Sequence, residues 1–493
     1  MINISEFYKG KDVFITGATG FMGKVLMEKI LRSCSNVGNV YILIRPKKGK
    51  DPSTRIKEIV EDPFFESLRQ KHPENIKKII PVLGDCMELG LGLTSTDRHL
   101  LIENVSLVFH CAASVRFDDP LKKAILLNTR GTREMFMLAK EMKNLKVIIH
   151  FSTAYCNCDR PEVEEIIYPP HGNWRDFINM AENIDEYTLD ILCSKLMRNL
   201  PNTYVFTKSL AEHVVNDLRG NLPTVIFRPS IVVSTLEDPI SGWIDNFNGP
   251  IGLTIGAGKG ILRTIFSSPH LNTDYVPVDV CIKGVILAAW DKGVSGDSSE
   301  LSIFNFSNNG MIPITTQQLI DIGLKICDEI PFEDILWYPY TTATDNKWVY
   351  YLKVYTQHLI PALIIDELLK CFGKPAMLCK IQRKVFMANM ALQFFTTRSW
   401  SFSNKNCLAL RARTLKEDKK EFFLDHVEDV NPVAHFRNCA IGARKYLLKE
   451  HPDTIPQSKK HYRRLYWIDK SLHAILIILV LWILFFLVMK LNF

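Results

Sequence analysis

The sequence has no CxxC pair among its twelve cysteines, and this absence argues against a structural zinc site. Only Cys156 and Cys158 lie close together, in a CxC spacing that suits zinc poorly. Residues 1–10 contain no apolar run, so no secretory signal is expected and the compartment should be reducing. We therefore expect reduced thiols buried in the core rather than disulfides.

The sequence also lacks Lys and Arg clusters within a recognisable nucleic-acid-binding module, so no nucleic-acid partner is expected. The formal net charge of +7 over 493 residues is modest and would suit a phosphorylated cofactor or an anionic membrane face. Hydrophobic residues make up 47% and charged residues 23%, so most of the chain should pack, in two or three domains.

Short apolar runs separated by helical patterns predict a parallel β-sheet. The runs are 12–16, 40–44, 79–83, 107–110, 147–151 and 225–227. Because their apolar residues are continuous rather than alternating, helices should cover both faces of the sheet. The predicted fold class is a doubly wound, Rossmann-type α/β sheet within residues 1–330, followed by a helical C-terminal domain at 331–450.

A glycine-rich turn follows the first predicted strand and opens a helix. Gly17 would permit the sharp turn, Gly20 would let the backbone approach a pyrophosphate, and Gly23 would let the helix pack closely on the strand. The helix N-terminus would face the phosphates, although glycines also form such turns by chance. The predicted cofactor contacts of this turn are Thr16, Gly17, Thr19, Gly20, Phe21, Met22 and Gly23.

The end of the second predicted strand is basic, in the run Arg45-Pro46-Lys47-Lys48. NAD-binding proteins place an acidic residue here for the ribose 2′-hydroxyl. A guanidinium can instead bind a 2′-phosphate and stack on adenine, so Arg45 favours NADPH over NADH. The alternative is a solvated basic loop.

Further candidates follow the third and fourth predicted strands, at the carboxyl ends where a doubly wound sheet binds its ligand. Asp85 would accept a hydrogen bond from the adenine amino group, or cap a helix. Ala112 lies in the loop after the fourth strand. Asn128 would orient a proton-relay water, or cap a turn.

Tyr204 and Lys208 are the predicted catalytic pair, because a spacing of four residues places both on one helix face. The Lys208 ammonium should lower the pKa of Tyr204, which would protonate an oxygen as hydride reaches the carbonyl carbon. A YxxxK pair also arises by chance on a solvated helix. Thr153, with Ser152 as second choice, would polarise the same oxygen. Arg228 would either brace its loop or contact the nicotinamide or a phosphate.

The C-terminal region carries an unbroken apolar run at 474–489, and the segment 472–493 approaches the ~20 residues that a bilayer requires. A buried core helix is the alternative. Basic residues before the run should stay on the cytosolic side; they are Lys459, Lys460, Arg463, Arg464 and Lys470. We predict a basic linker at 451–470 and a single-pass transmembrane tail anchor at 471–493, with the catalytic body facing the cytosol.

These motifs together resemble the extended short-chain dehydrogenases and, more closely, the alcohol-forming fatty acyl-CoA reductases of the male-sterility type. The family-like runs are Phe109–Phe117, Phe227–Ile231, Gly242–Pro250 and Gly256–Arg263, and the last two look peculiar to these reductases. The resemblance covers residues 1–290 and, more loosely, 350–450.

The resemblance implies that one NADPH reduces a long-chain fatty acyl-CoA to a bound aldehyde and a second NADPH yields a fatty alcohol, with release of CoA. The substrate oxygen would lie between Tyr204 and Thr153 in both steps. The alcohol would feed wax or ether-lipid synthesis, and the peroxisome membrane is favoured over the endoplasmic reticulum. Lys259 and Arg263 would contact the CoA phosphates or form a solvated face. The oligomeric state is left unknown.

Two other readings stay open. One is another membrane-bound extended short-chain dehydrogenase that shares the glycine turn and the Tyr204–Lys208 pair but acts on a sterol or a sugar nucleotide. The other is a catalytically silent NADPH-binding scaffold tethered to a membrane.

Overall fold

The computed structural model describes residues 2–46, 49, 51–308, 314–422 and 430–491. The chain forms two compact units, and it crosses between them five times. Unit 1 contains Met1–Ser241, Asp274–Pro313 and Trp400–Val430, and unit 2 contains Gly242–Thr273, Ile314–Ser399 and Asn431–Phe493. Residues 242–273, expected in the first domain, thus belong to unit 2, and residues 400–430, expected in the helical domain, belong to unit 1.

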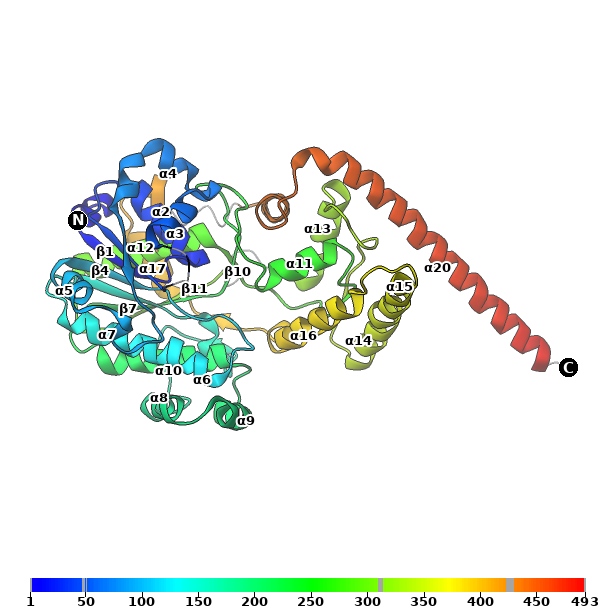
Figure 1. Cartoon of the computed structure of the whole chain (residues 1–493), viewed down its shortest axis with the longest axis horizontal. Helices are drawn as coiled ribbons and strands as arrows, with labels where there is room; N and C mark the ends of the chain where they lie inside the picture. Colours follow the sequence, from blue (N-terminus) through cyan, green and yellow to red (C-terminus); the bar gives the residue numbers. More distant parts are fainter. Residues whose placement is uncertain (1, 47–48, 50, 309–313, 423–429, 492–493) are drawn as a thin grey trace. The chain divides into compact units, whose positions relative to one another are not determined.

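Unit 1 is built on a seven-stranded parallel sheet (Figure 1). Its strands are β1 (Asp12–Thr16), β2 (Val40–Ile44), β3 (Ile79–Leu83), β4 (Val105–His110), β5 (Val147–Phe151), β7 (Thr224–Pro229) and β11 (Ser302–Phe306). The spatial order is β11-β7-β5-β4-β1-β2-β3, so the strand order reverses beside β1, where doubly wound folds bind their ligands. The six predicted strands are confirmed. Strand β11 was not predicted, because this edge strand mixes Ser and Asn with its apolar residues.

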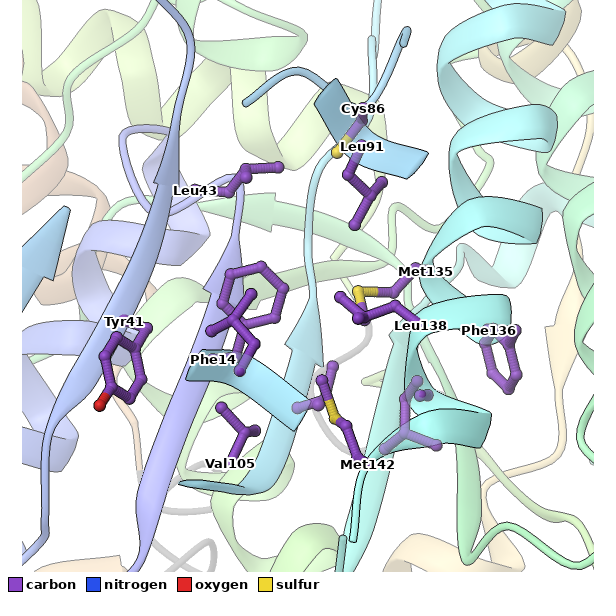
Figure 2. Close-up of a cluster of buried hydrophobic side chains, with 14 of the residues drawn as sticks. Phe14, Tyr41, Leu43, Cys86, Leu91, Val105, Met135, Phe136, Leu138 and Met142 are labelled. Carbon is purple, nitrogen blue, oxygen red and sulfur yellow. The ribbon is translucent and has the colours of Figure 1, made fainter. Parts of the chain in front are cut away.

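Helices cover both faces of this sheet, as the continuous apolar strands predict. Helix α12 (Val278–Ser295) contacts α2 (Phe21–Ser33), β5 and β7, and α7 (Gly131–Glu141) and α10 (Thr203–Leu218) cover the other face (Figure 1). Figure 2 shows Phe14 of β1 and Tyr41 of β2 in one cluster with Met135 and Phe136 of α7. Burying each such side chain stabilises the fold by roughly 1.5–3 kcal/mol.

The remaining elements of unit 1 surround this core. The helices are α1 (Ile4–Tyr8), α3 (Pro52–Val60), α4 (Glu66–Lys71), α5 (Ser95–Asn104), α6 (Leu121–Ala124), α8 (Trp174–Asn183), α9 (Glu186–Met197), α17 (Lys405–Arg413) and α18 (Lys419–Phe422). Short parallel pairs join β8 (Ile231–Val233) to β10 (Tyr275–Pro277), and β6 (Glu162–Val163) to β13 (Ser401–Phe402).

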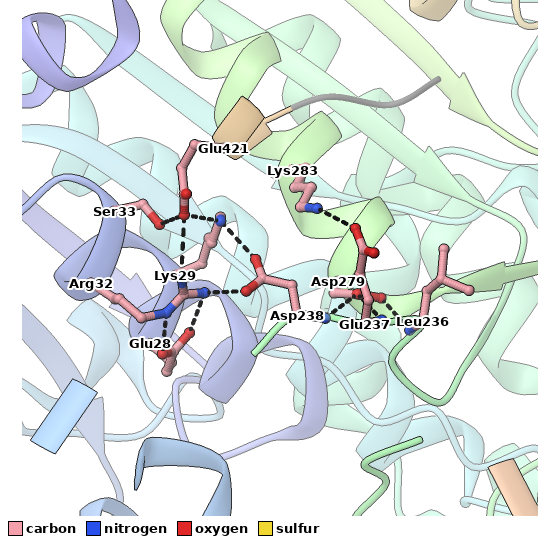
Figure 3. Close-up of polar contacts among 10 residues, drawn as sticks. All are labelled: Glu28, Lys29, Arg32, Ser33, Leu236, Glu237, Asp238, Asp279, Lys283 and Glu421. Carbon is pink, nitrogen blue, oxygen red and sulfur yellow. Dashed lines mark hydrogen bonds and ion pairs between the residues drawn. The ribbon is translucent and has the colours of Figure 1, made fainter. Parts of the chain in front are cut away.

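A polar cluster fixes the loop after β8 (Figure 3). The Asp279 carboxylate, in the first turn of α12, accepts hydrogen bonds from the backbone N–H groups of residues 236–238 at 2.8–3.0 Å. Lys29 of α2 lies 2.7 Å from Asp238 and 2.5 Å from Glu421. Burial alone would raise the pKa of Glu421, but the neighbouring cations and a hydroxyl lower it to about 2. This loop is therefore tied to the helix that the glycine turn opens.

Unit 2 is mainly helical, which confirms the predicted helical C-terminal region. Its helices are α11 (Pro250–Gly258), α13 (Thr316–Glu329), α14 (Lys347–Lys353), α15 (Ile360–Cys371), α16 (Leu378–Thr396), α19 (Pro432–Gly442) and α20 (Ile455–Leu491), and β9 (Thr264–Phe266) pairs with β12 (Thr342–Thr344). Gly242 has φ +75°, and a Cβ there would lie 2.1 Å from the Asn438 carbonyl oxygen. Part of the family-like run 242–250 is thus needed for close backbone packing.

Helix α20 continues without a break through residues 455–470, which the sequence predicted as part of a linker. The ring of Tyr338 packs edge-on against Tyr462 and Tyr466, at centroid distances of 5.1 and 5.2 Å. Within the described residues, 452–490 is the one helical stretch long and apolar enough to cross a membrane, and its most apolar window has a mean hydropathy of 3.0 and no buried residue.

Candidate active site

The glycine turn has the geometry that its sequence predicts. Gly17 has φ +74°, and a Cβ there would lie 2.7 Å from the backbone nitrogen of Ala112. A Cβ on Gly23 would lie only 2.3 Å from the Gly17 carbonyl oxygen. Gly20 caps α2, and its N–H donates to the Gly17 carbonyl at 2.9 Å. The helix N-terminus can therefore be approached by a phosphate without a side chain in the way.

The first and fourth strands are joined beside this turn by a buried polar chain. The Thr16 hydroxyl lies 2.8 Å from His110 Nδ1. The same hydroxyl accepts a hydrogen bond from the Ala112 N–H at 3.2 Å. Burial lowers the pKa of His110 to about 3, so its imidazole is neutral. The Thr16 side chain, predicted as a cofactor contact, is fully buried and engaged within the protein. The other predicted contacts, Thr19, Phe21 and Met22, are partly exposed around the start of α2.

The predicted adenosine contacts lie at the ends of β2 and β3. Arg45 is exposed, and its carbonyl accepts a hydrogen bond from Arg55 at 2.5 Å. Lys47 and Lys48 lie outside the described residues. The Asp85 carboxylate accepts from the Met87 N–H at 2.9 Å, within a turn and not at the start of a helix.

Helix α10 carries Tyr204 and Lys208, and it begins where Asn202 accepts a hydrogen bond from the Val205 N–H at 2.9 Å. The Lys208 ammonium is buried and donates to the carbonyl of Phe151 at 2.6 Å, at the end of β5. Burial lowers the pKa of Lys208 to about 8, against the opposing effect of nearby acidic groups. The lysine is thus joined to the strand that precedes the predicted hydroxyl residues.

The pKa of Tyr204 differs from the expected direction. Burial raises it to about 12, and a hydrogen bond with the Thr153 side chain lowers it only in part. Lys208 does not contribute to this shift in pKa, and its ammonium donates to the Phe151 carbonyl. The ring of Phe117 stacks on Tyr204 at a centroid distance of 6.2 Å. Tyr204 is therefore protonated at neutral pH, as a proton donor must be.

The two adjacent hydroxyl residues have different partners. Thr153 contacts Tyr204 and also accepts from the Tyr155 N–H at 3.3 Å. Ser152 donates to the Glu212 carboxylate at 2.5 Å and is buried. The structure therefore brings Thr153, and not Ser152, to the phenol.

Arg228 has a bracing role, which is one of the two roles that the sequence left open. Its fully buried guanidinium donates to Glu212 at 2.6 and 2.8 Å and to the carbonyls of Glu164 and Ile166. Glu212 itself was missed from the sequence. It follows Lys208 by four residues, so the helical spacing that identified the first pair extends to it.

Asn128 connects the loop after β4 to α10. It lies in a π-helical segment (Ile125–Arg130), and such segments are frequent at functional sites. Its amide donates to the Thr207 hydroxyl at 2.9 Å and accepts from the Ser114 N–H at 2.9 Å. The observed contacts are those of a bracing residue.

The basic residues considered for CoA phosphates are paired with acids inside unit 2. Lys259 lies 3.3 Å from Glu450, and Arg263 lies 3.5 Å from Asp469 of α20. Neither forms the open basic face that the sequence left as an alternative.

Within the part of the chain that the structure describes, no group of three His, Cys, Asp or Glu side chains could hold a metal ion. Eight of the twelve cysteines are buried, but Cys371 is exposed, contrary to the expectation of uniformly buried thiols.

Comparison with known families gives two matches. One model, for an NAD-binding region and described as male sterility protein, matches residues 15–285, and a second model of the same description matches residues 357–450. Together they span the glycine turn, the Tyr204–Lys208 pair and much of unit 2.

Curated relatives cover nearly the whole chain. Fatty acyl-CoA reductase wat of Drosophila melanogaster is 37% identical over 97% of this chain and 92% of its own. Fatty acyl-CoA reductase 1 of Xenopus laevis is 39% identical, and that of Homo sapiens 37%, each over 97% of this chain and 93% of its own.

Solved structures with the same fold are more distant in sequence. The reductase domain of a non-ribosomal peptide synthetase from Mycobacterium tuberculosis matches with a TM-score of 0.59 and 18% identity, over 90% of this chain and 95% of that domain. The terminal R domain of the myxalamid pathway matches with a TM-score of 0.58 and 17% identity, over 88% and 90% of the two chains.

Proposed function

Because this chain belongs to the fatty acyl-CoA reductase family, we propose that it reduces long-chain fatty acyl-CoA to fatty alcohol with two NADPH and releases CoA. The observation that carries the proposal is the position of Tyr204 one helical turn before the buried Lys208, which donates to the end of β5, with Thr153 near enough to lower the pKa of the phenol. We favour acyl-CoA over a sterol or a sugar nucleotide as the substrate, since the relatives that match nearly the whole chain are named fatty acyl-CoA reductases.

The chemistry follows from these side chains. Bound NADPH supplies hydride to the carbonyl carbon. Tyr204 donates its proton to the carbonyl oxygen, and the Thr153 hydroxyl stabilises the charge that develops there. In the first reduction the resulting hemithioacetal loses CoA as a thiol and leaves the aldehyde. In the second, the protonated oxygen becomes the alcohol hydroxyl. Lys208 would hold the nicotinamide ribose.

The residues around the glycine turn fit a dinucleotide, because bare backbone meets the N-terminus of α2 at Gly17 and Gly20. Arg45, exposed at the end of β2, supports NADPH because its guanidinium can pair with a 2′-phosphate. Asp85 would accept a hydrogen bond from the adenine amino group. Its carboxylate can accept several hydrogen bonds, and the Met87 N–H donates only one. Ala112 would line the same crevice.

The apolar half of α20 supports a tail anchor. Its described large apolar side chains are exposed from Leu472 to Met489, and basic residues precede it. The catalytic body would then face the cytosol, at a peroxisome membrane in preference to the endoplasmic reticulum. The alcohol would leave for wax or ether-lipid synthesis.

The test of this function is NADPH oxidation by the detergent-solubilised full chain with a series of acyl-CoA lengths, with products identified by mass. We expect two NADPH consumed for each fatty alcohol formed, and slower turnover with NADH. NADPH binding with no product at any chain length would instead support the silent scaffold. Turnover of a sterol or sugar nucleotide in place of acyl-CoA would contradict the substrate assignment.

Substitutions of the two hydroxyl residues, Thr153 and Ser152, should have different effects on kcat. Thr153→Val is expected to lower kcat by about 10²–10³, the usual loss when one oxyanion donor is removed, and to cost about 1 kcal/mol of stability, because the Tyr155 N–H loses its acceptor. Ser152→Ala leaves Glu212 short of a donor, so the free energy of unfolding should fall by about 1–3 kcal/mol while the phenol keeps its partner. Turnover and thermal unfolding are measured for both variants. Equal losses of kcat at matched stability would contradict the assignment of Thr153.

A further inference from the structure

Helices α14 and α15 of unit 2, with the π-helical segment (Val354–Leu359) between them, carry an unusually apolar surface. Trp348 is 84% exposed, Leu352 63%, Ile364 57% and Phe372 77%. We call this surface the apolar face, and it comprises Trp348, Leu352, Tyr355, Ile360, Leu363, Ile364, Leu368, Phe372 and Met377. Soluble monomers rarely expose so many large apolar side chains along one segment, so the face indicates a partner.

The orientation of the face is fixed by the packing of α15 on α16. The buried Asp366 carboxylate accepts hydrogen bonds from the N–H groups of Met377, Leu378 and Cys379, at 3.1, 2.9 and 2.9 Å. These bonds turn one side of α15 toward α16. Leu363 and its apolar neighbours therefore point outward in a held conformation rather than on a loose helix.

The charge around the face identifies the kind of partner. Residues 347–398 contain eight Lys and Arg residues but only two acidic residues, in a chain whose formal net charge is +7. One of the acids, Asp366, is buried and accepts hydrogen bonds from the N–H groups of residues 377–379. An apolar, aromatic surface within a basic segment matches the boundary between anionic headgroups and acyl chains, where Trp and Tyr are enriched. The same excess of positive charge opposes pairing with a second copy.

A cavity adjoins the face. It has a volume of about 250 Å³ and lies between the π-helical segment and α16. Its wall includes Tyr351, Val354, Leu359 and Phe386, and Tyr355, 56% exposed, belongs to both the cavity and the face. An apolar cavity at such a place suits an acyl chain that arrives from lipid.

We propose that the apolar face of unit 2 lies on the lipid bilayer, inserted at the level of the headgroups, as a membrane contact additional to the span in α20. This contact goes beyond the proposed reduction. It relies on the proposed anchor only because α20 belongs to the same unit and would bring that unit to the membrane. With two membrane contacts, unit 2 would stay at the bilayer surface, where acyl-CoA is present.

The test is photocrosslinking of the full chain in vesicles of phosphatidylcholine and phosphatidylserine that contain a trace of alkyne-tagged lipid. Leu363 of the face, Leu481 of the span and Val433 of α19 are each replaced, one at a time, by a diazirine amino acid. Val433 is the matched control, since it is 49% exposed against 47% for Leu363 and lies in the same unit. We expect lipid adducts at 363 and 481 and none above background at 433.

The outcomes separate the face from the anchor. An adduct at 481 without one at 363 would overturn the proposed face. A protein–protein adduct at 363, seen as a band of twice the mass, would overturn it in favour of self-association. Failure at 481 would count against the anchor, whereas an adduct at 363 in the same samples would still support the face. Unfolding temperatures of the three variants must match that of the unmodified chain.

Discussion

Replacing Tyr204 with Phe is expected to abolish fatty alcohol formation while NADPH binding is retained. The ring stays and can still stack on Phe117, but the proton that reaches the carbonyl oxygen is lost. Loss of a positioned general acid costs about 10²–10⁴ in rate. The measurements are product formation by mass spectrometry and cofactor affinity by fluorescence, both on the full chain in detergent.

The matched control for this variant is Tyr155→Phe. Tyr155 is a neighbouring tyrosine of unit 1, and its ring packs edge-on against Trp400 and Phe402 at 5.4 and 5.1 Å. Loss of its hydroxyl should leave turnover within a few-fold of the unmodified chain, as an approximate bound for a residue outside the proton path. Alcohol formation by Tyr204→Phe at the unmodified rate would remove Tyr204 from the mechanism.

Gly23→Ala is expected to destabilise unit 1, whereas Gly20→Ala should weaken cofactor binding in a folded protein. A Cβ on Gly23 would lie 2.3 Å from the Gly17 oxygen and 2.7 Å from the Ala18 Cα, and backbone atoms cannot move aside cheaply. Overpacking of this kind costs about 1–3 kcal/mol or more. A Cβ on Gly20 meets only the Gly17 oxygen, at 3.2 Å, but it would lie where the pyrophosphate approaches.

Denaturant unfolding and NADPH titration distinguish these two effects. The control is Gly323→Ala in α13, where an added Cβ meets nothing within 4 Å. Alanine is the better helix former, so this change should raise stability by up to about 1 kcal/mol. If Gly23→Ala unfolded like the unmodified chain, the close approach of α2 to the backbone of Gly17 and Ala18 would be contradicted.

Much of the fold and part of the site could be predicted because their signals are local. The six strands appear as short apolar runs, and the glycine turn and the Tyr204–Lys208 spacing each span fewer than ten residues. Strand β11 was the exception. Ser302 and Asn305 interrupt its apolar run, although four of the five residues in Ser302–Phe306 are buried.

The partners of polar side chains could not be predicted in this way. Lys259 and Arg263 looked available for phosphates, yet their carboxylate partners, Glu450 and Asp469, lie about two hundred residues away in sequence. The alternation of the chain between two units has the same origin. Contacts such as that of Gly242 with Asn438 join segments that are distant in sequence, so no local sequence pattern predicts them.

The class of fold, the glycine turn, the spacing of Tyr204 and Lys208 and the apolar C-terminal helix follow from local patterns, because periodicity and spacing act between near neighbours. Only the tertiary structure decided which hydroxyl meets Tyr204. Thr153 and Ser152 are adjacent and chemically alike, but Ser152 donates to Glu212, whereas Thr153 lies near the phenol. The tertiary structure also sets the pKa of Tyr204. Burial raises this pKa and hydrogen bonding lowers it in part, and neither effect can be read from the residue type.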